Sequence, residues 1–175
     1  MPARDGTLKA REFLFAAEDL ALAGLSTGFP QPERRVMWTI LQFHYGDPNV
    51  HFELQPQVSR GQVELGLHFE GLLENNERWA QRIADNAAPI AGALGPEWEL
   101  EEWTASWRRL HRVYPFEKLT RGLASDVAVD FTLLLTTLQR LVAEGVAEFG
   151  PSKPAVAKTA PPSRSERWHR KRARR

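Results

Sequence analysis

The chain has 175 residues with a formal net charge of +1, and 42% of its residues are hydrophobic, including six tryptophans. This length and composition favour one globular domain with a substantial core, and the lack of cysteine excludes disulfides and thiolate metal sites. Neither an apolar run long enough for a membrane span nor the apolar region of a signal peptide occurs, so we expect a cytoplasmic protein with no membrane partner.

The charges divide the chain into two parts. Residues 151–175 hold nine of the lysines and arginines and one acidic residue, whereas residues 1–150 hold 14 and 21. The last 25 residues are also rich in Pro, Ala and Ser, with too little apolar surface to offset the entropy lost on ordering. We therefore predict an acidic globular domain over residues 1–150, with a net charge of −7, and a disordered basic tail over residues 151–175, with a net charge of +8.

The first half of the chain predicts a helix followed by three strands. Apolar residues recur at helical spacing over residues 8–24. Strands are then expected at Val36–Tyr45, Val50–Gln55 and Gln62–Glu70, joined by the short turns GDPN and VSRG, which favour an antiparallel meander. The second and third strands alternate apolar and polar residues, which indicates one buried and one exposed face. The first is apolar on both sides, so it could lie centrally or meet another element or a partner with its second side.

The second half predicts a helix, a hairpin and a long helix. Helical spacing runs over residues 72–94, with a kink or break near Ala87 because Pro89 lacks an N–H. WELEEW and SWRRLHRVY predict a hairpin, and Ser125–Glu148 the last helix. In the hairpin we expect Leu100 opposite Leu110, Glu101 beside Arg109 and Glu102 beside Arg108. The fold class is thus α+β, with an antiparallel sheet of about five strands and the helices mainly on one face.

This order of elements is similar to that of the small dimeric chaperones that serve bacterial secretion systems, and its first part resembles the strand-helix core of PD-(D/E)xK nucleases. In the nuclease pattern the third strand carries Glu-x-Lys. Here the corresponding stretch is Glu64-Leu65-Gly66, whose lack of lysine argues against that chemistry. Both resemblances are of layout, and neither assigns a functional residue.

The tightest closure of both turns in the meander sets a specific register. It places Phe43, Phe52 and Leu67 in one row on the buried face, as the alternation requires. On the opposite, exposed face the same register aligns the histidines His44, His51 and His68, with Gln42, Glu53 and Gly66 in the next row.

These histidines are a candidate metal site. Opposed residues have Cβ atoms about 4.5–5.5 Å apart, so the imidazoles of His44, His51 and His68 could share a divalent metal. Glu53 or Glu70 would add an oxygen ligand or a general base. The alternative is that these histidines simply suit a solvated strand surface, because a slip of one residue in either turn disperses the row.

The tail is a candidate site for nucleic acid or an acidic partner. Its cations can neutralise phosphates and its tryptophan can stack on an unpaired base. Alternatively, it is a solubilising extension or folds back onto its own acidic domain. The residues concerned are Arg167, Trp168, Arg170, Lys171, Arg172, Arg174 and Arg175.

No phosphate-binding loop occurs in the sequence, and this favours binding over catalysis. We therefore expect a small binding or interaction protein that presents an open sheet face and a basic tail. Trp38 and Ile40, on the second apolar side of the first strand, favour a protein partner or a homodimer. The alternative is a metal-dependent enzyme that uses the histidine row, and a divalent metal is the only cofactor this implies.

Overall fold

The computed structural model describes residues 6–151 and contains six strands and four α-helices over this range. The elements are α1 (Ala10–Ala23), β1 (Glu33–Met37), β2 (Ile40–His44), β3 (Val50–Gln57), the 3₁₀ turn η1 (Val58–Arg60), β4 (Gln62–Phe69), α2 (Leu73–Asp85), α3 (Ala87–Leu94), β5 (Glu99–Glu102), β6 (Arg108–Pro115) and α4 (Arg121–Phe149). All strands pair antiparallel in the order β1-β2-β3-β4-β6-β5. The α+β class is confirmed, with six strands where about five were expected.

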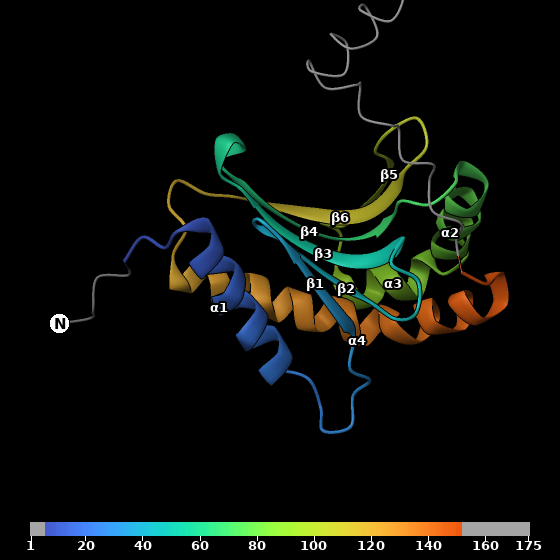
Figure 1. Ribbon diagram of the computed structural model, residues 1–175, viewed down its shortest axis with the longest axis horizontal. Helices are drawn as coiled ribbons and strands as arrows, with labels where there is room; N and C mark the ends of the chain where they lie inside the picture. The colour runs from blue at the N-terminus through green and yellow to red at the C-terminus, as the bar shows by residue number, and fades with distance from the viewer. Residues whose placement is uncertain (1–5, 152–175) are drawn as a thin grey trace, which may run out of the picture.

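The helices lie against one face of the sheet, as predicted. In Figure 1, α4 (orange) runs beneath the sheet, with α1 toward one end and α2 and α3 toward the other. We call the opposite face, which none of the described helices covers, the open face. The turn between β3 and β4 and the turn between β5 and β6 rise at opposite ends of this face (Figure 1).

The helix-covered face forms the core. Phe43, Phe52 and Leu67 form the predicted cross-strand row and are at most 1% exposed. Helix α4 supplies Phe131, whose ring stacks on Phe43 with 5.4 Å between centroids. The apolar side chains that alternate along the strands therefore pack against the apolar side chains on one side of α4 and form one layer.

The predicted strand Val36–Tyr45 is wrong, because the chain reverses within it. β1 ends at Met37 and β2 begins at Ile40, so the turn contains only Trp38 and Thr39. Trp38 takes a left-handed φ of 53°, a conformation that glycine or asparagine adopts more readily. Because neither residue occurs here, the sequence does not predict a turn. The two apolar sides of this stretch belong to two different strands, and the Trp38 side chain is 88% exposed at the turn.

One helix prediction is confirmed and one helix boundary differs. The stretch 72–94 is two helices separated at Asn86, beside the expected break near Ala87, and Pro89 lies in the first turn of α3, where backbone N–H groups have no helical partner to lose. The last helix begins at Arg121 instead of Ser125. Its cap is Thr120, whose hydroxyl accepts a hydrogen bond from the Leu123 N–H at 3.1 Å.

The hairpin β5–β6 has the predicted register in all three pairs. Its place in the sheet, beside β4, was not predicted, and it sets Arg109 opposite His68 and His111 opposite Gly66. A Cβ on Gly66 would lie 2.7 Å from the Leu110 carbonyl oxygen and 2.8 Å from the His111 Cβ. Glycine at this position therefore lets β6 approach β4 closely.

Two further expectations concern the ends of the chain and the membrane. The tail is outside the described residues, apart from Pro151, so its predicted disorder stays a prediction. Within residues 6–151, none of the helices combines the length and apolarity needed to cross a bilayer.

Candidate metal centre

Two cross-strand rows of polar residues occupy the open face. The predicted alignment of His44, His51 and His68 is confirmed, as is the neighbouring row with Glu53. Pairing with β1, β6 and β5 extends both rows across all six strands. The first row is Glu33, His44, His51, His68, Arg109 and Glu101, and the second is Arg35, Gln42, Glu53, Gly66, His111 and Glu99.

The centre of these rows is buried, whereas the sequence suggested an exposed face. His51 is 2% exposed, His68 0% and Glu53 6%. The polar side chains cover one another, and Trp103, from the turn between β5 and β6, meets the His68 ring edge to face at 5.3 Å between centroids. The Arg109 guanidinium lies 4.8 Å from the Trp103 ring centroid. The exposed-face expectation failed because it did not include β6 and this turn.

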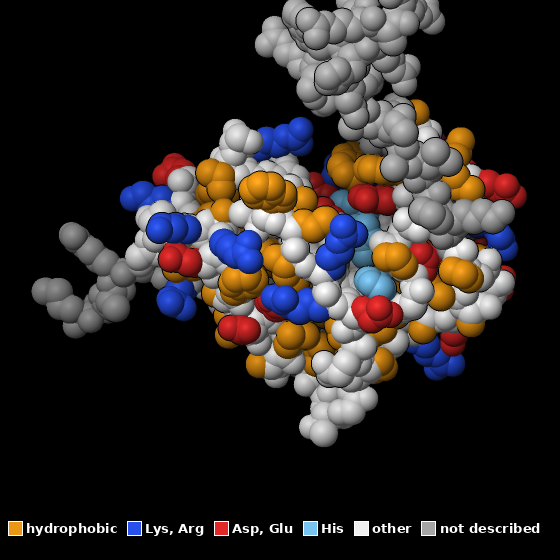
Figure 2. Space-filling view, in the orientation of Figure 1, with side chains coloured by type: hydrophobic (Ala, Val, Ile, Leu, Met, Phe, Trp, Pro, Cys, Tyr) orange, Lys and Arg blue, Asp and Glu red, His pale blue; other side chains and the backbone are white. Residues whose placement is uncertain are grey.

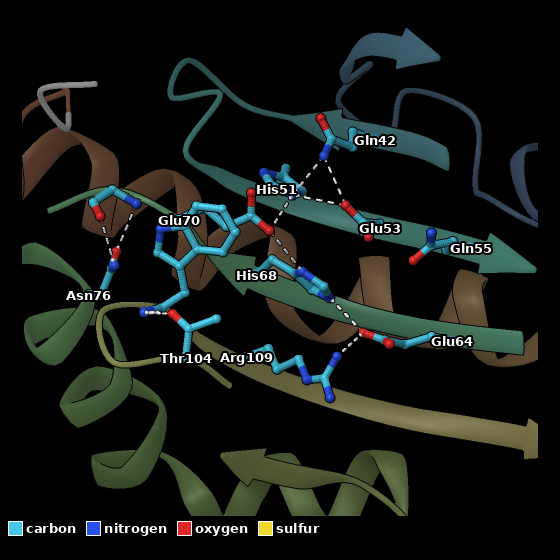
Figure 3. A network of polar contacts seen from close by, with 12 residues as sticks. Gln42, His51, Glu53, Gln55, Glu64, His68, Glu70, Asn76, Thr104 and Arg109 are labelled. Carbon is cyan, nitrogen blue, oxygen red and sulfur yellow. Dashed lines mark hydrogen bonds and ion pairs between the residues drawn. The ribbon is translucent and has the colours of Figure 1, made fainter. Parts of the chain in front are cut away.

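Three of these side chains and that of Glu70 converge as possible metal ligands (Figure 3). His51, Glu53, His68 and Glu70 each offer one nitrogen or oxygen atom, and these atoms all lie within 4.8 Å of one another. We call them the β3–β4 cluster. Three of the four predicted ligands are therefore together. His44 is not among them, since its Nδ1 lies 3.8 Å from the Glu33 carboxylate at the edge of the sheet.

The orientation of His51 leaves one ring nitrogen facing the cluster. Its Nδ1 lies 2.9 Å from the Pro48 carbonyl oxygen, which can only accept, so Nδ1 carries the proton and donates. Nε2 then lies 3.2 Å from Glu53 Oε2 and 3.9 Å from Glu70 Oε1. A backbone carbonyl that accepts from the other ring nitrogen is the usual way in which a protein orients a histidine ligand.

Glu53 is held by a neighbouring amide. Gln42 donates from Nε2 to Glu53 Oε2 at 2.8 Å, and the same nitrogen lies 3.0 Å from His51 Nε2. Burial raises the pKa of the Glu53 carboxyl, but hydrogen bonds from His51 and Gln42 and the charge on His68 bring the pKa below its ordinary value. Glu53 is therefore a buried carboxylate with a fixed orientation.

His68 lies between two carboxylates. Its Nε2 is 3.1 Å from Glu64 Oε1, and its Nδ1 is 3.3 Å from Glu70 Oε1. Burial lowers the pKa of His68, but the two carboxylates outweigh this and raise the pKa to about 9. Burial likewise raises the pKa of Glu64, while His68 and Arg109 reverse the effect and lower it to about 2.

The charge of this region favours the uptake of a cation. Glu53, Glu64 and Glu70 supply three carboxylates, and Arg109 is the permanently charged cation bonded to Glu64, with an Nη1 to Oε1 distance of 2.6 Å. Two further positive charges are therefore needed to balance them. A proton on His68 supplies one, and a bound divalent ion supplies both.

The spacing of the cluster is also close to what a metal requires. A tetrahedral ion with bonds of about 2.0–2.2 Å holds its ligand atoms about 3.3–3.6 Å apart. The three distances between possible ligands given above are 3.2, 3.3 and 3.9 Å. Small side-chain movements would bring these atoms to bonding geometry.

A pocket of about 540 Å³ lies beside η1. Its lining includes η1, Gln55, Gln57 and Trp103, but none of the four residues of the β3–β4 cluster. Gln57 donates to Glu64 Oε2 at 2.9 Å, which links the pocket to the carboxylate beside His68. Figure 2 shows histidine side chains at the surface between acidic and basic ones. The volume is within the range of small-molecule sites, about 300–1,000 Å³.

Sequence reasoning did not place Glu64, Arg109 or Trp103 at this site. The alternation of β4 places Glu64 on the same face as His68, so that signal was available. The contributions of Arg109 and Trp103 depend on pairing between β4 and β6, for which the sequence has no local signal. Burial and the charge on Arg109 also lower the pKa of the neighbouring His111.

The basic residues proposed to bind nucleic acid, Arg167–Arg175, lie outside the described residues, and that binding stays a prediction. Comparisons with protein-family models, with curated proteins and with solved structures find no match, so the candidate site depends on its geometry alone.

Proposed function

We propose that the protein binds a divalent transition-metal ion through His51, Glu53, His68 and Glu70. The observation that carries this is the orientation of His51. Its Nδ1 donates to the Pro48 carbonyl, so its Nε2 is the ring nitrogen that faces the carboxylates of Glu53 and Glu70. Two imidazoles and two carboxylates suit zinc, manganese, iron or cobalt better than calcium or magnesium, which prefer oxygen ligands.

A metal-dependent reaction is the more specific form of this proposal. Trp103 contacts His68 and also lines the pocket of about 540 Å³, so this side chain links the pocket to a proposed metal ligand. Glu70 has a side chain that is 20% exposed and is the ligand nearest to solvent. Its displacement by water would open a coordination position, which a catalytic metal needs.

The test is metal binding by the untagged full chain near neutral pH, measured by calorimetry with Zn²⁺ and with Co²⁺. We expect a tight binding event that His51→Ala weakens by roughly 100-fold, because this change removes a ligand. His44→Ala is the matched control, since it removes a histidine from the same row but outside the cluster, and it should leave this event unchanged.

The design separates loss of binding from loss of folding. Glu70→Gln alters a partly exposed ligand, and circular dichroism checks that each variant retains its helices and strands. The proposal fails if folded His51→Ala and folded Glu70→Gln both bind the ion as tightly as the wild-type chain.

Association with a second copy of the chain is another candidate function. Trp38 is 88% exposed at the turn between β1 and β2, and β1 is an edge strand with one side unpaired within the described sheet. An exposed aromatic beside a free strand edge favours association. Trp38→Ala should lower the self-association measured by sedimentation velocity. Val129→Ala, which alters another exposed apolar residue, should not.

A further inference from the structure

We propose that a second cation site, formed by His111, Glu101 and Glu99, lies on the hairpin β5–β6. These residues each offer one atom to a group whose members all lie within 4.8 Å of one another. We call this group the hairpin cluster. It shares no ligand with the β3–β4 cluster, so each of the two proposed sites can be tested and rejected without the other.

Strand pairing brings the three residues together. Glu99 lies directly opposite His111 in the ladder between β5 and β6. Glu101 is two residues further along β5 and therefore points to the same face. Its Oε1 lies 3.1 Å from His111 Nε2. One imidazole and two carboxylates thus meet on the antiparallel hairpin β5–β6, whose register was already predicted from its charges.

His111 is the observation that points to a ligand. It is 8% exposed, and neither ring nitrogen makes a hydrogen bond of good geometry with a described residue, although Nε2 lies 3.1 Å from Glu101 Oε1. Leaving a buried polar group without a hydrogen bond costs about 1–3 kcal/mol, so such groups usually have a partner. A cation coordinated by one of these nitrogens would provide it.

The neighbouring Arg109 leaves room for this ligation. Its Nε donates to Glu101 Oε1 at 2.6 Å, and its Nη1 donates to Glu64. The described contacts of Glu101 all use Oε1. Its Oε2 is thus the oxygen that can face a cation, while Arg109 keeps the carboxylate in place.

In each of the two cross-strand rows, one residue lies between the β3–β4 cluster and the hairpin cluster. In one row Gly66, which has no side chain, lies between Glu53 and His111. In the other, Arg109 lies between His68 and Glu101, and its positive charge keeps two bound cations apart. Two ions would therefore bind as separate events instead of forming a bridged pair.

The hairpin cluster should bind more weakly than the β3–β4 cluster. It has three protein ligands instead of four, and Glu99 is exposed to solvent. Its imidazole and carboxylates select a borderline ion such as Zn²⁺ or Co²⁺. Water would complete the coordination, so this ion would exchange readily.

The experiment is a titration of the untagged full chain with Zn²⁺ and, for its visible absorption, with Co²⁺. We expect two binding events in the wild-type chain. His111→Ala should remove the weaker event and leave the tighter one, whereas His51→Ala should do the reverse. His44→Ala is the control for both, and His169 is present in every variant, so any binding by it cancels in the comparison.

Glu99→Gln is the second variant, because an exposed strand residue can be changed with little risk to folding. It should weaken the second event by roughly tenfold or more. The hairpin site is overturned if folded His111→Ala or Glu99→Gln retains both events with wild-type affinities. One event that only His111→Ala removes would support the hairpin site and reject the β3–β4 site, and one event that only His51→Ala removes would do the opposite.

Discussion

The two faces of the sheet are closed to water by different interactions. On the helix-covered face, Phe43 and Phe52 are at most 1% exposed because α4 and the neighbouring strands pack against them. On the open face, His51 and His68 are equally buried, at 2% and 0%. Those histidines are covered by other polar side chains and by Trp103 from one turn.

This difference sets what each face responds to. Apolar burial stabilises in proportion to the area removed from water and does not depend on pH. A buried ionic network contributes only while each charge has its partner, since removal of one partner leaves an uncompensated charge. We therefore expect the helix-covered face to determine stability and the open face to respond to protons and ions.

The largest effect should come from the apolar face. Phe52→Ala removes a ring that is 0% exposed and should lower the free energy of unfolding by roughly 3–5 kcal/mol, similarly at neutral and alkaline pH. Urea denaturation with a chelator present measures this. Val129→Ala, at a side chain 66% exposed, should change the same quantity by less than about 0.5 kcal/mol. A loss from Phe52→Ala that varied strongly with pH would break the comparison.

The next largest effect should be the pH dependence of the free energy of unfolding of the metal-free protein. Because the folded-state pKa of His68 is raised from 6.5 to about 9, its stabilising contribution is complete below pH 6.5 and is lost as the pH rises through about 9. The free energy of unfolding should fall by about 3 kcal/mol over this range. Urea denaturation across this range, with a chelator present, measures it.

His68→Gln provides the comparison for that slope, because glutamine keeps a hydrogen-bonding side chain and does not titrate. The variant should be less stable at low pH and show little change over the same range. At the acidic end, Glu64 contributes stability above pH 4.5 that is lost as the pH falls toward about 2. An equally steep alkaline slope in His68→Gln would show that another group is responsible.

The smallest of these effects should come from the contact between β4 and β6. Gly66→Ala places a Cβ against the Leu110 carbonyl oxygen and the His111 Cβ, and should lower the free energy of unfolding by roughly 1–3 kcal/mol. Gly92→Ala is the matched control. No atom lies within 4 Å of a Cβ built on Gly92, and alanine favours its helix, so stability should be unchanged or slightly raised.

Much of the sheet was predictable from local patterns. The alternation of β3 and β4, together with the short turns, was enough for the pairing of His51 with His68, because a shift of one residue would turn the apolar side chains outward. Opposite charges were enough for the pairing of Glu101 with Arg109. The turn at Trp38 was missed because neither of its residues is one that tight turns favour.

The sequence by itself determined which residues face the core and which histidines share a row. Both follow from the period of two in an extended chain and from the short turns that set the strand register, which act between near neighbours. Only the tertiary structure decided that this row is buried, that Glu70 replaces His44 in the cluster, and that Arg109, Trp103 and His111 lie beside it. The burial of the row and the positions of Arg109, Trp103 and His111 depend on β6 pairing with β4. Residues of α2, α3 and β5 separate these strands along the chain, and pairing at that distance is set by packing of the whole domain.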